Sequence, residues 1–410
     1  MKRLLRWLVL LLLGWIGTNY VEVKRYRQIM LWLPKLFAGG LAPVLGAASG
    51  VLGLVGLCRC DVVTAAAGAL GAALAAQYTR QLVAPHEGFA AAFGSDWQSR
   101  ITSTQRARML RERYVGVLPT APEPRWTQDL VFWTLSGAGP DGGDRALLCD
   151  LWQPPAHVTP SGLGLVYLHG SGWHWMDKDA GTRPFFRHLA AQGHVIVDVA
   201  YRLSPETDMA GMVGDAKRAV AWLKAHAAEY GVDPGRVVIS GGSAGGHLAL
   251  LAAYTPNHPA LDPPDLAGVD TSVCGVISYY GPADLTLFYR WLDTLAPSSE
   301  SPLERAMDAR FQEAFHAIFG EDFDLGELTA MLTQPLGGSP DEVPEAYALF
   351  SPLTHVGPGN PPTLLLQGAH DLGVRPAIAR TLRDALRQAG VPVVYVEYPR
   401  ADHGFDLFVP

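Results

Sequence analysis

The hydrophobic pattern of the chain changes near residue 83. Before that point, long apolar runs without any charged residue occupy Trp7–Tyr20, Leu36–Cys58 and Val62–Thr79. The second run has 23 residues, enough to cross about 30 Å of hydrocarbon as a helix. Small residues recur four positions apart in the last two runs, which suits close helix contact in lipid. The pattern predicts a membrane anchor over residues 1–83, built from two or three hydrophobic helices. A buried pair of soluble helices is the alternative.

Basic residues flank the first apolar run on both sides, so the pattern leaves two orientations open. Lys2, Arg3 and Arg6 precede this run, and further lysines and arginines lie between residues 24 and 35. If all three runs span, one basic cluster lies outside, against the positive-inside tendency. If the first run lies in the membrane interface, both clusters and the rest of the protein stay inside. The predicted location is therefore an integral membrane anchor, with the side of the catalytic domain left open.

Beyond the anchor, residues 84–125 carry alternating charge and end in a proline-rich stretch. This composition predicts a juxtamembrane linker with one polar helix around Thr102–Arg113. In residues 126–410, short apolar runs alternate with helical patterns, which indicates an α/β fold with a mostly parallel sheet covered on both faces. The predicted strands are Asp129–Leu135, Ala146–Gln153, Gly164–His169, His194–Ala200, Arg236–Ser240, Cys274–Tyr280, Pro362–Gln367 and Val393–Tyr398. The predicted helices are Arg183–Gln192, Met212–Glu229, Ala244–Tyr254 and Pro376–Ala389.

Two parts of this catalytic domain depart from strict alternation. The first two predicted strands are joined through a turn rich in Gly and Asp, which predicts an antiparallel hairpin at the sheet edge. Between residues 284 and 350 the alternation lapses into polar helical patterns such as Leu303–Phe319. Loops at the carboxyl ends of parallel strands carry the functional site, so an inserted lid is expected in that interval.

Composition excludes several classes of protein. The net charge of −7 provides no basic face, and the sequence has no nucleic-acid-binding motif. The four cysteines have neither the spacing of a disulfide framework nor that of a zinc site. The chain is thus expected to need no metal or organic cofactor and to bind no nucleic acid, and its oligomeric state stays open.

A strand running into Gly241-Gly-Ser243-Ala244-Gly245 and then into a helix carries the first chemical signal. On such a turn, Gly-x-Ser-x-Gly holds the serine in a strained conformation with its hydroxyl exposed above the sheet. The amino terminus of the following helix adds partial positive charge where an oxyanion forms. A plain glycine-rich turn is the competing interpretation. The pattern predicts Ser243 as a nucleophile.

A second glycine-rich turn follows an earlier predicted strand, at His169-Gly-Ser171-Gly172-Trp173. Acyl transfer requires backbone amides aimed at the developing oxyanion, and small residues let a loop supply them. We therefore expect the amides of Ser171, Gly172 and Ala244 to form an oxyanion hole. The alternative is a glycine turn in which His169 and Trp173 only pack.

An activated serine needs a base and an acid that orients it. Asp371 and His403 each follow a late predicted strand, so both loops open on the same sheet edge as Ser243. The chain order Ser, Asp, His is that of α/β-hydrolases. Asp284 is an alternative acid, and His370 and His174 are alternative bases.

Several segments together resemble the hormone-sensitive-lipase-like carboxylesterases of the α/β-hydrolase fold, over about residues 126–410. These segments are His-Gly-Ser-Gly-Trp, Tyr201-Arg-Leu-Ser-Pro-Glu206, Gly-Gly-Ser-Ala-Gly-Gly, Tyr280-Gly-Pro-Ala-Asp284, Asp371 and His403-Gly-Phe. The family includes bacterial carboxylesterases, arylacetamide deacetylase and isoprenylcysteine methylesterase-like proteins, some with membrane anchors. The resemblance implies the Ser243, Asp371 and His403 triad and the oxyanion donors Ser171, Gly172 and Ala244. It also implies that Glu206 and Asp215 are supporting rather than catalytic residues.

The chain departs from the family pattern at two places. The family's oxyanion loop usually reads His-Gly-Gly-Gly, whereas position 171 is serine, which costs about 1 kcal/mol if that residue needs a positive φ. Only seven residues follow His403, where relatives usually place a closing helix, so we expect the linker or the anchor to cover the last strand.

The expected function is hydrolysis of a carboxylic ester through an acyl-enzyme, with an apolar or lipid-like substrate that reaches the site from the membrane. An amide or acetyl-group deacetylase of the same fold is the main alternative. A catalytically inactive receptor on this scaffold is a further one, although no triad residue is missing.

Overall fold

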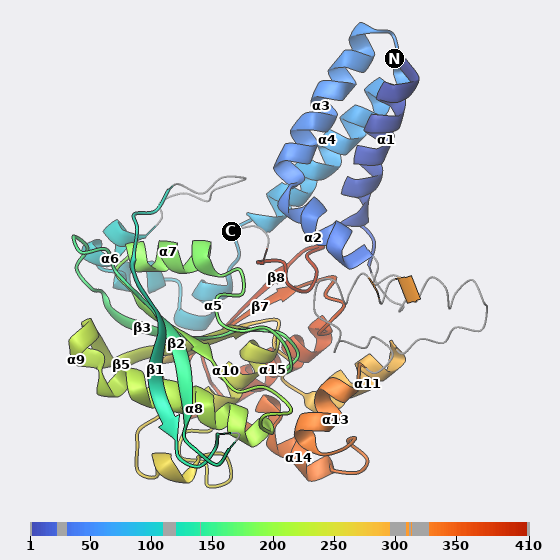
Figure 1. The fold of residues 1–410 in the computed structure, drawn as a ribbon. Coiled ribbons are helices and arrows are strands. Elements are labelled where there is room, and N and C mark those ends of the chain that lie inside the picture. The colour runs from blue at the N-terminus through green and yellow to red at the C-terminus, as the bar shows by residue number, and fades with distance from the viewer. Residues whose placement is uncertain are drawn as a thin grey trace.

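The computed structural model describes residues 2–22, 31–109, 120–139, 141–295, 309–310, 313 and 328–407. Within these residues, a narrow helical bundle projects from a larger α/β domain (Figure 1). The bundle contains the apolar runs that precede residue 83, and the α/β domain contains all eight strands. The boundary seen in the hydrophobic pattern is therefore also the place where the architecture changes.

The eight strands form one sheet in the order β1-β2-β4-β3-β5-β6-β7-β8. The β1–β2 and β2–β4 pairs are antiparallel, and all other neighbours are parallel. The predicted edge hairpin and the mostly parallel α/β-hydrolase sheet are thus confirmed. The strands are β1 (Arg125–Leu135), β2 (Arg145–Gln153), β3 (Gly162–Leu168), β4 (Val195–Ala200), β5 (Val232–Gly242), β6 (Gly275–Tyr279), β7 (Thr363–Gly368) and β8 (Val393–Tyr398).

Helices cover both faces of the sheet, as a parallel sheet requires. On one face, α8 (Met209–Ala225), α10 (Ala244–Tyr254) and α15 (Pro376–Gln388) contribute to the main hydrophobic core. On the other face, α7 (Arg183–Ala191) packs Phe186 and Ala190 against the strands. The short helix α9 (Ala227–Tyr230) follows α8.

The last strand is covered by a segment from the linker. Helix α5 (Gly88–Phe93) places Phe89 and Phe93 against Val394 and Val396 of β8. Within the described residues, the linker thus packs on the last strand, which was one of the coverings expected for it. The remaining linker elements are the short 3-10 helix at Trp97–Arg100 and α6 (Ser103–Arg108), whose side chains Thr102 and Gln105 form a capping box. The predicted polar helix extends beyond α6 into residues 110–113, which lie outside the described residues.

The expected lid interval contains three described helices. They are α11 (Leu285–Thr294), α13 (Ala330–Leu336) and α14 (Pro344–Leu349). Most of the predicted helical pattern Leu303–Phe319 lies outside the described residues. A lid over this interval stays a prediction.

Three helices form the projecting bundle: α1 (Lys2–Thr18), α3 (Ala42–Cys58) and α4 (Val62–Leu82). Two contacts show that α1 lies along α4. At the end of the bundle far from the α/β domain, Arg6 Nε is 3.0 Å from Asp61. At the end near that domain, the Tyr20 hydroxyl donates to the Leu74 carbonyl at 2.8 Å. The N-terminus therefore lies at the end of the bundle that is remote from the α/β domain (Figure 1). The first run therefore packs alongside α4, and whether it spans a membrane stays a prediction.

Close packing of α3 on α4 depends on glycine. A Cβ on Gly68 would lie 2.5 Å from the Gly53 backbone, and a Cβ on Gly56 would lie 2.5 Å from the Ala65 nitrogen. Larger residues would force the helices apart. The close contact that the small-residue spacing predicts is confirmed.

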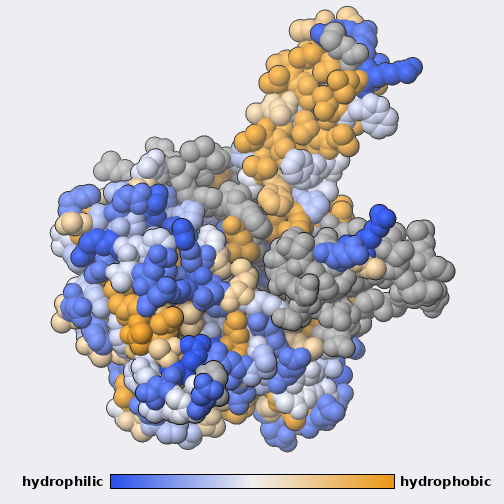
Figure 2. All heavy atoms as spheres, viewed as in Figure 1, coloured by the Kyte–Doolittle hydropathy of each residue, from blue (hydrophilic) through white to orange (hydrophobic). Residues whose placement is uncertain are grey.

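The outer surface of the bundle is apolar, as Figure 2 shows. Trp7, Leu57 and Val62 are 67%, 66% and 79% exposed. A contiguous apolar surface of this kind is unusual on a soluble protein and typical of an interaction with membrane. By length and composition, α4 is one candidate span within the described residues, and the bent pair α2 and α3 is a second.

The prediction of a single helix over Leu36–Cys58 is wrong. The chain forms α2 (Trp32–Gly40) and α3, which are bent by 77° about Leu41. Pro43 has no amide to donate back to the carbonyl of Gly39, and its ring clashes with a continuous helix. The two glycines before the break add conformational freedom. As a result, α2 leaves the bundle axis and lies against the α/β domain.

Candidate active site

Ser243 occupies a sharp turn between β5 and α10. Its φ is +53° and its ψ is −119°, a conformation that an L-residue adopts only under strain. A Cβ on Gly241 would lie 2.4 Å from the carbonyl carbon of Gly245. A Cβ on Gly245 would lie 2.1 Å from the carbonyl oxygen of Leu168. The glycines thus permit the close approach of β3 that this turn requires.

The three residues predicted from the chain order meet at this turn. His403 Nε2 lies 3.0 Å from Ser243 Oγ, and His403 Nδ1 lies 3.0 and 3.1 Å from the two carboxylate oxygens of Asp371. One imidazole nitrogen can therefore receive the hydroxyl proton while the other donates to the carboxylate.

Asp371 is held from its far side. Its Oδ2 accepts a hydrogen bond from Gln367 Nε2 at 2.7 Å, and its Oδ1 accepts one from the Val374 amide at 2.8 Å. The carboxylate is 2% exposed, so few orientations remain open to it. Sequence reasoning missed Gln367, which lies four residues earlier at the end of β7.

The pKa of His403 is raised above its ordinary value of 6.5. Burial by itself lowers the pKa, but the facing Asp371 carboxylate stabilises the imidazolium and outweighs burial, with smaller contributions from Asp402 and Asp406. His403 therefore becomes neutral at a higher pH than an ordinary histidine does. Serine activation should therefore be lost as the pH falls through this raised value.

The loop expected to supply oxyanion donors lies beside the serine. A Cβ on Gly170 would lie 3.3 Å from the Ser243 Cβ. Ser171 and Gly172 have φ values of +128° and +61°, so Ser171 adopts a positive-φ backbone that glycine would adopt without strain. Neither of their amides donates to a backbone acceptor among the described residues. The Ser171 hydroxyl donates to the Trp175 carbonyl, which ties this side chain to its own loop.

A cavity of about 220 Å³ opens in front of Ser243 and His403. Its wall is mostly apolar, and the helices of the lid interval contribute much of it. The apolar lining residues from that interval are Phe288, Leu292, Leu295, Leu328 and Met331. An apolar group beside the scissile bond would be the natural occupant.

The alternative acid and bases have other partners. Asp284 accepts a hydrogen bond from the Leu287 amide at 2.9 Å and caps α11. His174 Nε2 lies 3.2 Å from the Met331 carbonyl, and burial lowers the pKa of His174. The exception is His370, whose imidazole Nδ1 has no hydrogen-bond partner among the described residues. Among the described residues, His403 is the histidine within hydrogen-bond distance of Ser243.

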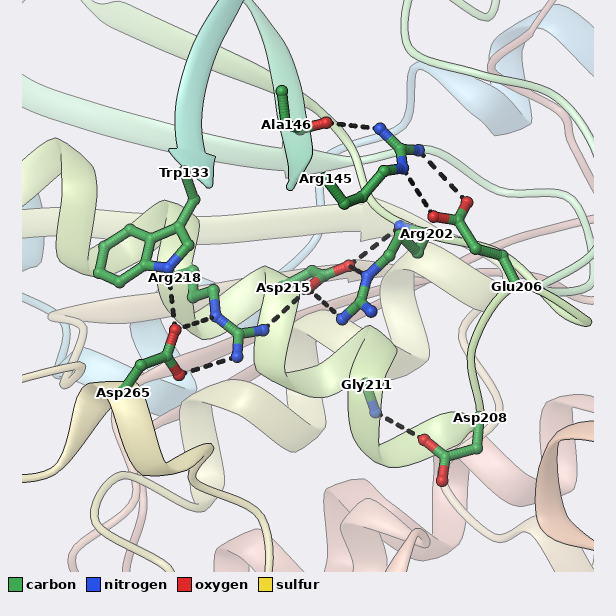
Figure 3. A network of polar contacts seen from close by, with 10 residues as sticks. All are labelled: Trp133, Arg145, Ala146, Arg202, Glu206, Asp208, Gly211, Asp215, Arg218 and Asp265. Carbon is green, nitrogen blue, oxygen red and sulfur yellow. Dashed lines mark hydrogen bonds and ion pairs between the residues drawn. The ribbon is translucent and has the colours of Figure 1, made fainter. Parts of the chain in front are cut away.

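The acids Glu206 and Asp215 belong to a polar network away from Ser243 (Figure 3). Asp215 is fully buried and accepts hydrogen bonds from the side chains of Arg202 and Arg218 at 2.8–2.9 Å. Glu206 pairs with Arg145 at 2.7 Å. Both acids are thus engaged by arginines, as expected of supporting residues.

Sequence reasoning also missed a contribution from the anchor. Trp32 of α2 lines the cavity, and its Nε1 donates to the His403 carbonyl at 2.8 Å. Lys35, on the same helix, forms an ion pair with Asp402 in which both side chains are 1% exposed. Asp402 Oδ1 also accepts from the amides of His403 and Leu372, at 2.9 and 3.0 Å. Helix α2 therefore contacts the loops that carry the catalytic histidine and aspartate candidates.

Sequence comparison places these features among known proteins. The chain matches the BD-FAE family model over residues 149–318 and the prolyl oligopeptidase family model over residues 322–406. The esterase LipQ of Mycobacterium tuberculosis is 30% identical over 350 residues, which cover 83% of this chain and 73% of LipQ. The chain belongs to the hormone-sensitive-lipase-like carboxylesterase family of α/β-hydrolases.

Other carboxylesterase relatives share a smaller part of their length. The probable carboxylic ester hydrolase LipM of the same organism is 35% identical over 266 residues, covering 64% of this chain and 54% of LipM. The chain thus spans about half the length of LipM. Among solved structures, Thermogutta terrifontis esterase 2 phosphonylated by sarin is 25% identical with a TM-score of 0.49, covering 70% of this chain and 87% of that one.

Proposed function

We propose that this carboxylesterase-family protein is a membrane-anchored serine hydrolase of carboxylic esters. The observation that carries the proposal is the alignment of Ser243 Oγ, His403 Nε2 and Nδ1, and the Asp371 carboxylate at the wall of an apolar cavity. Family membership supports ester hydrolysis, and the geometry supports the assignment of these three residues.

In the proposed mechanism, His403 takes the proton of Ser243 as its oxygen attacks the ester carbonyl. Asp371 holds the imidazole in the required tautomer and stabilises the imidazolium. The amides of Ser171, Gly172 and Ala244 hold the oxyanion, and the positive end of α10 adds to this field. The imidazolium returns its proton to the leaving alcohol. Water then attacks the acyl-enzyme by the same route and releases the acid and free Ser243.

The apolar cavity and the apolar outer surface of the bundle support a lipid-like ester as substrate. In this arrangement the anchor holds the site at the membrane surface, where such esters partition. Enzyme reconstituted in vesicles should therefore prefer esters of long or bulky apolar groups. A strict preference for acetyl esters of soluble alcohols would contradict this part of the proposal.

Labelling with a fluorophosphonate tests the nucleophile. Purified wild type should be labelled, and Ser243→Ala should not. A matched control is Ser240→Ala, because Ser240 is buried on the same strand and should leave labelling intact. Absence of labelling in folded wild type would favour an inactive receptor over an enzyme.

The match to the prolyl oligopeptidase family over residues 322–406 favours amides as a second candidate substrate class. Paired esters and amides with the same acyl group separate the two. We expect the ester to be cleaved far faster. Equal or faster cleavage of the amide would assign the protein as a deacylase of amides.

A further inference from the structure

A second cavity, of about 520 Å³, lies where the anchor meets the α/β domain. One wall is formed by α2 and α4, including Leu36, Tyr78 and Leu82, and the opposite wall includes Leu189 and Gln192 at the end of α7. In Figure 1 this junction is at the base of the projecting bundle. If the bundle is embedded, the cavity lies at the depth of the lipid headgroups and the first methylenes.

This second cavity adjoins the catalytic one. Tyr167, Thr182 and Leu407 line both cavities. These three residues therefore lie between the base of the bundle and the space in front of Ser243, where a passage between the two cavities would have to open. An apolar chain that enters between α4 and α7 would meet the scissile-bond position without crossing bulk water.

Unpartnered polar atoms in this cavity point to a ligand that carries oxygen. Asn19 is 2% exposed and lines the second cavity, and its Nδ2 has no hydrogen-bond partner among the described residues. The hydroxyl of Thr182, which lines both cavities and is 9% exposed, also has none. Leaving such groups unsatisfied costs about 1–3 kcal/mol each, which an ester carbonyl or hydroxyl at these positions would offset.

We propose that the second cavity is a lateral portal through which a single-chain lipid ester passes from the bilayer to Ser243. Its apolar chain lies between α4 and α7, and an ester or hydroxyl oxygen accepts a hydrogen bond from Asn19. The portal rests on the proposed ester hydrolysis, since it identifies the substrate class and the route to the same serine.

Obstruction of the portal separates this route from the chemistry. Leu82→Trp and Gln192→Trp fill the cavity from opposite walls, and neither residue lines the catalytic cavity. Ala76→Trp is the matched control, because Ala76 is exposed on the same helix as Leu82. Full-length proteins in phosphatidylcholine vesicles are assayed with a bilayer-embedded palmitoyl ester and with the soluble acetyl ester of the same chromogenic alcohol.

We expect both obstructing variants to lower the ratio of palmitoyl to acetyl kcat/KM by about tenfold or more, whereas Ala76→Trp keeps the wild-type ratio. An unchanged ratio in both obstructing variants would overturn the portal, whether the two activities are both retained or both reduced equally. Failure of wild type to cleave either ester would instead refute the proposed function.

A binding measurement keeps the portal testable without turnover. A palmitoyl ester with a photoactivatable diazirine on its chain, dissolved in the same vesicles, should crosslink to peptides of α4 and α7 in Ser243→Ala. This crosslinking should be lost when Leu82→Trp is added. Crosslinking confined to the outer surface of the bundle would refute the portal.

Discussion

The ion pair between Lys35 and Asp402 offers the sharpest test of whether the anchor supports the catalytic loops. Both side chains are 1% exposed, and Asp402 also binds the amides of His403 and Leu372. Lys35→Met removes the ammonium and leaves the carboxylate buried. Breaking a buried pair in this way costs about 3–5 kcal/mol. For a domain of this size, such a loss corresponds to a fall of roughly 5 °C or more in the thermal midpoint.

The pH dependence of this loss follows from the carboxyl group. Burial raises the pKa of Asp402 above its ordinary value of 3.8, and Lys35 opposes the rise. Without Lys35, the pKa of Asp402 in the folded protein rises further. A group with a raised folded pKa stabilises fully below its unfolded pKa, and this stability is lost as the pH rises through the folded pKa. The cost of Lys35→Met should therefore grow as the pH rises above the ordinary pKa of an aspartate, by up to about 1.4 kcal/mol per pH unit, until the pH reaches the raised pKa of Asp402.

A double-mutant cycle measures this coupling. Thermal midpoints and kcat are recorded in detergent at several pH values for Lys35→Met, Asp402→Asn and the double variant. Asparagine retains an oxygen for the two amides, so the double variant should recover most of the stability and kcat lost by Lys35→Met. Lys35→Arg should retain the charge and act as the conservative control. If Lys35→Met matches wild type at every pH, or the double variant is no better than Lys35→Met, the reasoning is refuted.

Three further predictions concern single residues. Because Asp371 raises the pKa of His403, Asp371→Asn should lower kcat and move the acidic inflection of kcat/KM to lower pH, measured over a pH series with a soluble ester; an unmoved inflection would contradict the pairing. Ser171→Gly should be more stable than Ser171→Ala by about 1 kcal/mol, because only alanine retains the strain at φ +128°; equal thermal midpoints would argue against that strain. Burial raises the pKa of Asp198 to about 8, so the contribution of this carboxyl to the stability of the folded protein is lost as the pH rises through that value. In thermal unfolding, Asp198→Asn should therefore be more stable than wild type at pH 9 but not at pH 5.

The sheet could be predicted closely from the sequence because its signal is local. Runs such as Val393–Tyr398 are rich in valine and tyrosine, which are typical of strands, and this strand has the predicted bounds. The helix at Ala244–Tyr254 also has its predicted bounds. Ser243, Asp371 and His403 each follow a predicted strand, so their loops were expected to open on the same sheet edge. The structure brings the three side chains together.

The missed features involve partners that are far apart in the chain. Lys35 and Asp402 are 367 residues apart, and no local period connects them. A lysine inside an otherwise apolar segment was a signal in retrospect, because a buried ammonium requires an acidic partner. The break at Leu41 was missed for a different reason. The segment Leu36–Cys58 is apolar throughout, so its hydropathy gives no sign of a break. The helix is interrupted by the backbone properties of glycine and proline, which hydropathy does not measure.

The α/β domain is stabilised by contacts with residues that precede its predicted start in the hydrophobic pattern. A fragment that begins at the predicted domain start, residue 126, would lose Phe89 and Phe93 from the face of β8. Both side chains are only partly buried, so the value of about 1.5–3 kcal/mol for full burial is an upper limit for each of them. The same fragment would lose the ammonium opposite Asp402 and the indole donor to the His403 carbonyl. All of these losses fall on β8 and the loop that follows it, the loop that carries His403. Residues before 126 therefore pack on β8 and on the loop that carries His403, so the arrangement around His403 should depend on them.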